Sequence, residues 1–298
     1  MVVAAPVRMG RRCLADAIES AVGRGPVMTR VRTSTGFAQY VQLRSLRVQW
    51  PVEGKISGFA HAFVGAFDAA FNTNYARHFG NPVFRENRVT SAVAALGVAS
   101  NLGLLIVEGI GVDRSMARAS DSTWQALAQF TRATGIPVLC LATPGAAVFG
   151  LSKLSSATGT LAPNGLIEIT RCRKASEKHW IDICKAQFDA TLREAGVTEM
   201  PLWFPPLAYD LTLGYPGLLA SALTNIALHL LSLGVRKFSA EMLQTYGAQA
   251  LTLHEGEVSA VRQIDRGGKY TKASLIRHSD WLSLSQLSST HLVPELAP

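Results

Sequence analysis

An acidic residue at the end of an apolar run is the first feature of this chain that can do chemistry. Leu104–Val107 are four consecutive apolar residues, and Glu108 follows them directly. The β-branched Ile106 and Val107, with a glycine on either side of the segment, favour a strand buried on both faces. Ligands bind outside the carboxyl ends of strands in open α/β sheets. Glu108 is therefore a candidate for acting on a ligand; the alternative is a plain core strand with a solvated terminal Glu.

A second candidate site lies near the start of the chain. A short apolar stretch, Val2–Ala4, precedes a polar turn and then a helical pattern, Cys13–Val22. Strand, turn and helix is the context of the phosphate-binding loop G-x-x-x-x-G-K-[ST]. Of its four fixed positions only the second glycine is matched. The candidate nucleotide-binding residues are Ala5, Pro6, Val7, Arg8, Met9, Gly10, Arg11 and Arg12.

The departures from this loop fall on its charged and hydroxyl positions. Arg11 takes the place of the Lys that reaches the β- and γ-phosphates, and its planar head is not equivalent to a compact ammonium group. Arg12 takes the place of the Ser/Thr that binds Mg²⁺, and a guanidinium group has only donors. The amides at a helix N-terminus would still favour an anion here.

The bulk composition is that of a globular protein with a basic bias. The 298 residues are 48% hydrophobic and 17% charged, which excludes a disordered chain. The net charge is +8, and residues 1–60 hold nine Lys and Arg against three acidic residues. This excess permits binding to the phosphates of a nucleotide or a nucleic acid, although an ordinary arginine-rich composition would also produce it.

Cysteine usage and hydropathy bear on the compartment. The cysteines lack CxxC spacing and lie far apart: Cys13, Cys140, Cys172 and Cys184. They predict a reduced, cytoplasmic chain without a cysteine-bound metal, and the short apolar start predicts no signal peptide. Gly217–Val235 has no charge over 19 residues, but Asn225 and His229 interrupt it. We expect a buried or amphipathic helix there and no membrane span.

Alternating strand and helix patterns predict an α/β fold with a largely parallel sheet. The expected strands are Val2–Ala4, Val27–Arg32, Leu43–Trp50, Leu104–Val107, Ile136–Thr143 and Leu166–Thr170. The expected helices are Cys13–Val22, Ile56–Phe71, Asn87–Ser100, Ser120–Thr134, Ser176–Ala195, Gly217–Val235 and Ala240–Leu253. Because a helix separates them, we expect Leu104–Val107 and Pro137–Leu141 to be neighbouring central strands.

The loss of strands after about Arg173 indicates a domain boundary. We predict an α/β nucleotide-binding-like core over residues 1–173 and a helical domain over 174–266. Residues 267–298 form a polar tail that we expect to be poorly packed.

The order of these segments resembles the TnsC/TniB-type AAA+ ATPases that regulate DNA transposition. Val41–Tyr75 is similar to the family's strand, turn and helix, and LLIVEGIG at 104–111 is similar to its Walker B sequence LLIIDEIQ. Ala133–Ala146 is similar to its sensor-1 strand, and Ala208–Leu243 to its helical lid. The resemblance implies a P-loop NTPase (AAA+-like) parallel sheet with helices on both faces, followed by a helical lid domain. Since Met1 falls almost inside the family's first strand, we expect the usual N-terminal segment to be absent.

The resemblance also implies roles for site residues, with ATP and Mg²⁺ as cofactors. Glu108 takes the place of the metal-holding Asp, and Gly109 that of the Glu that orients the attacking water. A register shifted by one residue would make Glu108 the catalytic residue instead. Thr143 matches the sensor-1 polar residue near the γ-phosphate. With the loop Lys and the Glu absent, we expect hydrolysis to be weak or lost, since single electrostatic groups are each worth about 10²–10³ in rate elsewhere.

The partners implied by the resemblance are double-stranded DNA, a transposase, a target-selection protein and further copies of the chain. Arg85 and Arg88 lie roughly where the family presents a DNA-facing loop and helix. Three hypotheses remain: a working ATP-dependent regulator of transposition, a non-hydrolysing module that binds DNA or partners, and a decayed mobile-element remnant.

Overall fold

The computed structural model describes residues 1–51, 54–78, 86–111, 119–268 and 271–288, and its chain divides into two compact units. The α/β unit comprises Met1–Ala5, Arg11–Glu168 and the segment from Leu282 onward. The helical unit comprises Pro6–Gly10 and Ile169–Trp281. The helical unit therefore includes part of the expected phosphate loop and begins slightly before the expected boundary.

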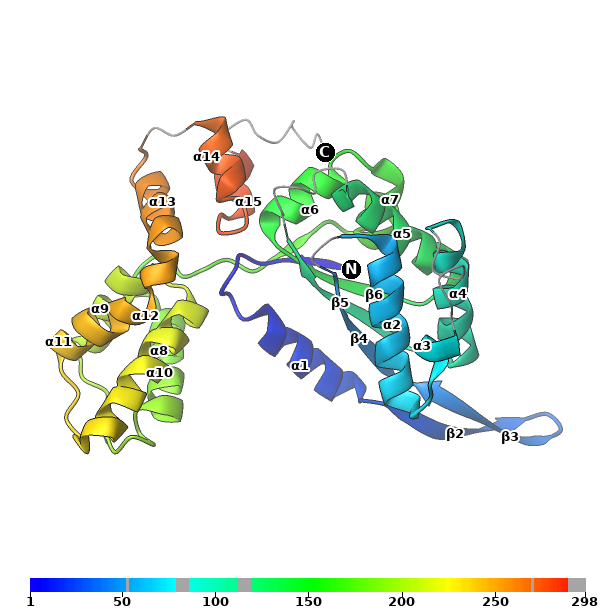
Figure 1. Ribbon diagram of the computed structural model, residues 1–298, viewed down its shortest axis with the longest axis horizontal. Helices are drawn as coiled ribbons and strands as arrows, with labels where there is room; N and C mark the ends of the chain where they lie inside the picture. The colour runs from blue at the N-terminus through cyan, green and yellow to red at the C-terminus, as the bar shows by residue number, and fades with distance from the viewer. Residues whose placement is uncertain (52–53, 79–85, 112–118, 269–270, 289–298) are drawn as a thin grey trace. The chain divides into compact units, whose positions relative to one another are not determined.

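The α/β unit is built on a five-stranded parallel sheet with the order β4-β5-β6-β1-β7 (Figure 1). Its strands are β1 (Val2–Ala4), β4 (Ser45–Gln49), β5 (Leu104–Ile110), β6 (Val138–Ala142) and β7 (Ile167–Glu168). Val107 of β5 lies opposite Val48 of β4 and Cys140 of β6. The prediction of two neighbouring central strands is confirmed, while the last strand is shorter than expected.

One face of this sheet carries the main apolar core. Alternate strand residues are buried there, among them Leu46, Leu105 and Val107. The residues that pack against them come from α2 (Ile56–Phe71), α4 (Glu86–Ala99), α5 (Ala119–Thr134), α6 (Pro144–Leu151) and α7 (Ser155–Leu161). The short helix α3 (Tyr75–His78) follows α2. The aromatic residues at i, i+4 spacing in α2 belong to the core, since Phe59 and Phe63 are buried. Fully burying such a side chain stabilises the fold by about 1.5–3 kcal/mol relative to leaving it exposed.

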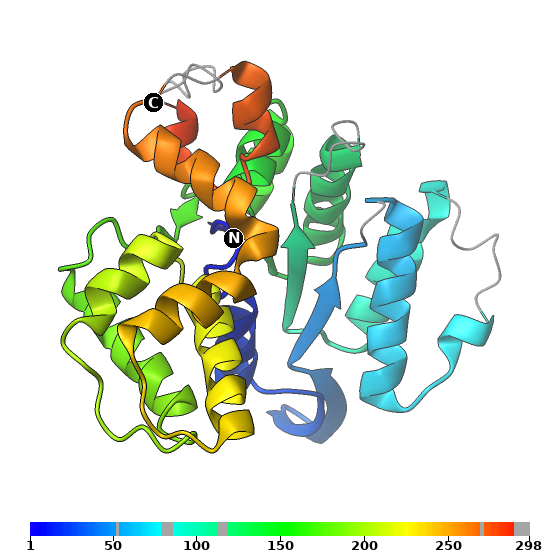
Figure 2. The same cartoon turned by 60° about the vertical axis from the view of Figure 1, so that its left-hand side comes forward.

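The opposite face of the sheet is covered by α1 (Arg11–Val22), which packs on β4 and β5 (Figures 1 and 2). Ala15 of α1 is fully buried, as are Ile106 and Leu141 of the strands. The predicted parallel sheet with helices on both faces is thus confirmed. Two charged residues, Arg47 and Glu108, share this second face with the apolar residues, because side chains alternate along each strand.

A two-stranded antiparallel hairpin is an addition that the sequence analysis missed. β2 (Pro26–Thr33) pairs with β3 (Gly36–Leu43) in a separate sheet. The expected strand at 27–32 is confirmed as β2, and it lies outside the parallel sheet. The expected strand at 43–50 is in fact the end of β3 followed by β4. The alternating pattern after Gly36 was the available signal, with the two residues between Thr33 and Gly36 as the turn.

The helical unit packs its helices around a second core. It contains α8 (Lys178–Thr191), α9 (Phe204–Thr212), α10 (Pro216–Leu233), α11 (Ala240–Met242), α12 (Ala248–Ala250), α13 (Glu255–Asp265) and α14 (Lys272–Arg277). Trp180, Phe188 and Phe204 are fully buried in this core.

The helix expected over 240–253 is interrupted by a π-helical turn, η1 (Leu243–Gly247), and ends in a 3₁₀ turn, η2 (Thr252–His254). Asn225 donates its side-chain N–H to the Tyr246 carbonyl at 2.7 Å. This bond from a neighbouring helix competes with the regular helical bonding of that carbonyl.

The C-terminal segment corrects another expectation. Residues 271–288 form α14 and α15 (Leu284–Ser288), so the prediction of poor packing is wrong for them. Leu282 and Leu287 are fully buried in the α/β unit. In the same segment the Leu284 N–H donates to the Glu168 carboxylate at 2.7 Å. Isolated apolar residues in a polar stretch were sufficient to dock this segment. Residues 289–298 lie outside the described part of the chain.

Among the described residues, α10 is the one helix long and apolar enough to cross a membrane by length and composition. Its residues Leu219, Leu223, Ile226 and Leu230 belong to the core of the helical unit. The expectation of a buried helix is therefore confirmed for this face of α10.

Gly150 offers a test of packing under α6. A Cβ placed there would lie 2.0 Å from the indole nitrogen of the buried Trp124. We expect Gly150→Ala to lower the free energy of unfolding by about 1–3 kcal/mol through overpacking, although Ala favours helix over Gly by about 1 kcal/mol. Gly65→Ala in α2 is the control, because nothing lies within 4 Å of its Cβ position. Urea unfolding measures both variants, and equal stability of the two would contradict this packing.

Candidate functional site

The expected site residues of the α/β unit meet at the carboxyl edge of the sheet. The Ala5 N–H at the end of β1 donates to the Ala142 carbonyl at the end of β6, at 3.0 Å. The Thr143 N–H donates to the Ile110 carbonyl at the end of β5, at 2.9 Å. Because these bonds join the ends of three neighbouring strands, Ala5, Thr143 and the Glu108 strand share the edge where α/β sheets bind ligands.

Glu108 is held in a two-pronged ion pair. Its two carboxylate oxygens accept hydrogen bonds from Nε and Nη2 of Arg47, both at 2.9 Å. The exposed fractions of the two side chains are 13% for Glu108 and 19% for Arg47. The hydrogen bonds from Arg47 to Glu108 raise the pKa of the guanidinium above its ordinary value. This fork geometry is the strongest form of a carboxylate–arginine pair.

Arg47 binds further carboxylates of α1 as well. Its Nη1 contacts Asp16 and lies 3.9 Å from Glu19. Arg24 pairs with Glu19 at 3.2 Å from the outer side of this cluster. The carboxylates of Glu108, Asp16 and Glu19 therefore share the positive charge of the Arg47 guanidinium, which stands where a bound cation could otherwise neutralise them.

Gly109 has a backbone conformation that residues with a side chain rarely adopt. Its φ is +79°, and a Cβ built on it would lie 1.8 Å from Nε2 of Gln49. The β5–β6 register shifts between Val107 and Ile110, which marks a bulge at this point. The position expected for the water-orienting Glu is thus a backbone bend, which glycine adopts without strain.

Thr143 ends β6 and begins α6. Its hydroxyl accepts the Ala146 N–H at 3.3 Å, which makes it the N-cap of that helix. The side chain is nearly fully buried. At this position Thr143 has a structural role in starting a helix at the edge of the sheet.

Arg11 and Arg12 open α1 in the α/β unit. Nη1 of Arg11 donates to the Ile110 carbonyl at 3.5 Å, which brings the guanidinium to the end of the Glu108 strand. Arg12 is exposed. The structure thus brings Ala5, Arg11, Glu108 and Thr143 to one edge of the α/β unit.

The loop Pro6–Gly10 belongs to the helical unit and forms a tight turn. The Met9 N–H donates to the Pro6 carbonyl at 3.3 Å, and Arg8 has a left-handed φ of 66°. The Val7 N–H donates to the Asp280 carbonyl at 2.8 Å. A phosphate loop points its amides at the phosphates, whereas here at least two of them are bonded to carbonyl groups.

The Arg8 backbone and side chain both contact the helical unit. The Gly217 N–H, at the start of α10, donates to the Arg8 carbonyl at 2.8 Å. The guanidinium of Arg8 lies 2.6 Å from Nε2 of His254 in η2. Since arginine can only donate, the ring nitrogen must be the acceptor. Burial, and then the charge of Arg8, lower the pKa of His254.

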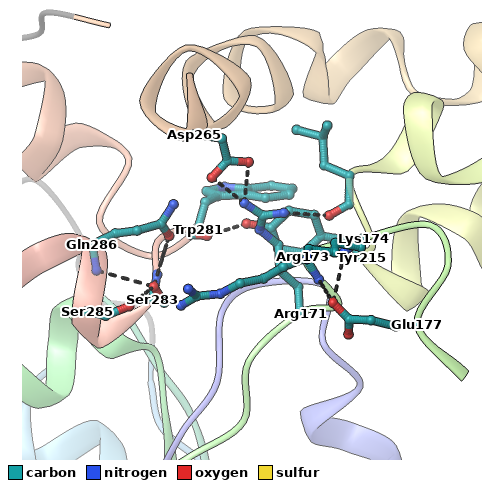
Figure 3. A network of polar contacts seen from close by, with 11 residues as sticks. Arg171, Arg173, Lys174, Glu177, Tyr215, Asp265, Trp281, Ser283, Ser285 and Gln286 are labelled. Carbon is teal, nitrogen blue, oxygen red and sulfur yellow. Dashed lines mark hydrogen bonds and ion pairs between the residues drawn. The ribbon is translucent and has the colours of Figure 1, made fainter. Parts of the chain in front are cut away.

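A buried arginine joins several segments of the helical unit (Figure 3). Nη1 of Arg171 donates to the Leu213 carbonyl at 2.9 Å, and Nη2 binds the Asp265 carboxylate in α13. The guanidinium also faces the ring of Tyr215 at 5.5 Å, and the Tyr215 hydroxyl donates to the Trp281 carbonyl. Burial raises the pKa of Tyr215 and keeps its hydroxyl protonated. Nearby, Glu177 accepts the N–H groups of Arg173 and Lys174 at 2.8 and 2.9 Å.

These residues do not fit Mg²⁺. Across the ranges that the structure describes, no group of three or more His, Cys, Asp or Glu side chains is arranged to hold a metal ion. Glu108 is engaged by Arg47, and Arg12 stands where a hydroxyl would be needed. The four cysteines are free, and burial raises the pKa of the Cys140 thiol to about 12.

The expected DNA contacts are only partly placed. Arg85 lies outside the described residues, and Arg88 lies in α4. Sequence reasoning found Glu108 but missed Arg47, Gln49, His254 and Arg171. One signal was present for Arg47, since a single charged residue within an apolar strand needs an opposite charge nearby.

Comparisons with known proteins support the fold. No protein-family model matches this chain, and no curated protein is similar in sequence. Among solved structures, the ORC2 protein of Aeropyrum pernix, described in ADPNP–ADP complexes, has a TM-score of 0.51 at 12% identity; the similarity covers 99% of this chain and 75% of that one. A Walker-type ATPase of Pyrococcus abyssi has a TM-score of 0.44 at 14% identity, over 97% of this chain and 83% of that one. The similarity to the ORC2 structure shows that the two chains share a fold.

The Arg47–Glu108 pair predicts a defined pattern of stabilities. We expect Arg47→Met to lower the free energy of unfolding by about 1–3 kcal/mol, because it leaves Glu108 largely desolvated and unpaired. Adding Glu108→Gln to Arg47→Met should recover part of this loss, with a coupling of about 0.5–3 kcal/mol. Arg24→Met, whose side chain is 60% exposed, is the control and should cost about 1 kcal/mol or less. Additive effects in urea unfolding would contradict the pairing.

The Arg8–His254 contact predicts a pH dependence of stability. The ordinary pKa of His254 is 6.5, and it is lower in the folded protein. The stabilisation is therefore complete above pH 6.5, and it is lost as the pH falls through the lower, folded pKa, because the unfolded chain takes up the proton first. On acidification we expect the free energy of unfolding of the wild type to fall relative to that of His254→Gln. The Gln side-chain carbonyl accepts a hydrogen bond from Arg8 at any pH. His179→Gln, on an exposed position of α8, is the control. A difference that does not change between pH 7.5 and 5 would refute the contact.

Proposed function

We propose that this protein is an AAA+-like regulator of DNA transposition that assembles on DNA and links target selection to a transposase without turning over ATP. The AAA+-like fold supports the general class. The order of the four sequence segments similar to TnsC/TniB-type proteins supports the specific role.

The observation that carries the loss of hydrolysis is the forked ion pair between Arg47 and Glu108. Phosphoryl transfer in P-loop proteins requires a metal ion on the β- and γ-phosphates and a group that orients water. The carboxylate that would help hold the metal is neutralised by a guanidinium group. The neighbouring position is the left-handed Gly109, which has no side chain to orient water.

We propose that a bound nucleotide acts as a structural ligand and is not hydrolysed. Arg11 at the carboxyl edge keeps a positive charge suited to a phosphate group. The turn at 6–10 has amides committed to carbonyl groups, so we expect nucleotide affinity to be weak.

Assembly on double-stranded DNA is proposed to proceed through backbone contacts, with Arg85 and Arg88 among them. A net charge of +8 supports affinity for a polyanion. Homo-oligomers, a transposase and a target-selection protein are the proposed partners, in the cytoplasm. A non-hydrolysing module that binds DNA without any role in transposition is the alternative.

Steady-state ATP turnover tests this proposal. With duplex DNA present, we expect turnover about 10²-fold or more below the 1 s⁻¹ of ordinary enzymes, and no change in Glu108→Gln. Asp16→Asn is the matched control, because it removes another carboxylate from the same arginine. Turnover near about 1 s⁻¹ that is abolished by Glu108→Gln and retained by Asp16→Asn would overturn the proposed loss of hydrolysis. Titration with labelled ATP and ADP measures binding separately.

A further inference from the structure

The outer part of the hairpin β2–β3 is an exposed ribbon, while Leu43 at its base is buried in the main core. Its strands pair over eight positions, from Pro26 opposite Leu43 to Thr33 opposite Gly36. All ten residues from Val31 to Tyr40 are exposed, and Figure 1 shows the hairpin extending from the five-stranded sheet. A two-stranded ribbon without a packed face is marginally stable in water.

The two faces of this ribbon differ in chemistry. The pairing register places Met28, Arg30 and Arg32 of β2 on one face, together with Phe37, Gln39 and Val41 of β3. The other face carries threonine, valine, alanine and Tyr40, and no charge. We call the first of these the arginine face. It is basic, aromatic and exposed, with Phe37 at 62% exposure and Met28 at 64%.

Within the described residues, no ion pair neutralises the arginine face. The chain has no acidic residue from Ser20 to Val52. Among the residues that the structure describes, the recorded ion pairs of this region involve Arg24 and Arg47, and none involves Arg30 or Arg32. Two unpaired guanidinium groups on one face of an exposed ribbon are an attractive site for an anionic surface.

One of these groups is held in place. The guanidinium carbon of Arg30 lies 4.1 Å from the centre of the Phe37 ring across the ribbon. Stacking on the ring restricts the long side chain and does not use its in-plane N–H donors, so less rotamer freedom is lost when it binds. Arginine binds phosphate oxygens through two parallel N–H donors.

We propose that the arginine face of the β2–β3 hairpin binds the phosphate backbone of duplex DNA. The inference deepens the proposed function, because it names a contact surface for the same DNA in a different part of the chain from Arg85 and Arg88. Charge complementarity selects a polyanion, and a second copy of the chain would bring the same positive face against this one. A two-stranded ribbon is also narrow enough to lie in the major groove of B-form DNA.

The salt dependence of binding tests the proposal. We expect wild type to bind unrelated duplexes with similar affinity, with log affinity falling linearly with log salt by about 0.9 per phosphate contacted. Arg30→Ala/Arg32→Ala should weaken binding to every duplex and flatten this slope by about two units, about one for each lost contact. Arg266→Ala/Arg277→Ala removes the same charge from exposed positions of the helical unit, and we expect it to keep the wild-type slope.

Two further variants separate charge from geometry and from folding. Arg30→Lys/Arg32→Lys keeps the charge and should keep most of the slope. Phe37→Ala should weaken binding less than the double Ala variant, since it frees Arg30 without removing it. Circular dichroism and thermal unfolding must match wild type for each variant, because the substituted positions are exposed.

The outcomes distinguish this inference from the proposed function. Binding by wild type with an unchanged slope in Arg30→Ala/Arg32→Ala overturns the hairpin site and leaves DNA assembly intact; loss of slope in Arg85→Ala/Arg88→Ala alone would then place the contact there. A lack of duplex binding by wild type at about 50 mM salt overturns both. Binding that survives equally on single strands or on an acidic polypeptide would contradict recognition of duplex DNA.

Discussion

A parallel sheet has to be buried on both faces, and this requirement organises the α/β unit. Helices α2, α4, α5, α6 and α7 are among those that pack on the face that carries Leu105 and Val107, and α1 packs on the face that carries Ile106. The strands can therefore be apolar almost throughout. A charged residue is tolerated under α1 only when an opposite charge lies beside it, which is how Arg47 and Glu108 come to share that face. The principal chemical feature of the carboxyl edge thus follows from the packing of the sheet.

The same pair limits what the edge can do. A carboxylate at the end of a central strand is well placed to hold a metal ion, and in this chain an arginine from the next strand occupies its oxygens. The bend at Gly109 turns the backbone immediately afterwards, and Gln49 fills the space where a side chain would project. Glu108 is thus bound to an arginine, and the adjacent position, Gly109, carries no side chain.

In the helical unit, polar contacts to the backbone join segments that are distant in the chain. Arg171 binds the carbonyl before Gly214 and the carboxylate of Asp265, which fixes the start of the unit to α13. The short segment Pro6–Gly10 joins this unit through hydrogen bonds to Asp280 and Gly217. Since the Val7 amide and the Arg8 carbonyl are used in these bonds, the segment serves as a structural connection in the helical unit.

The sequence by itself determined the parallel sheet, its central pair of strands, the aromatic core stripe of α2 and the helical character of the second half. These features depend on apolar periodicity, which is local and survives without knowledge of neighbours. It also identified Glu108, because the residue directly follows an apolar run that is typical of a buried strand. Only the tertiary structure decided what Glu108 contacts, that Gly109 is a bend, that Thr143 caps a helix and that residues 271–288 are packed. The Thr143 cap is local, since its partner is Ala146. The others depend on residues that are distant in the chain, such as Arg47 and Gln49, and local patterns carry no information about such partners.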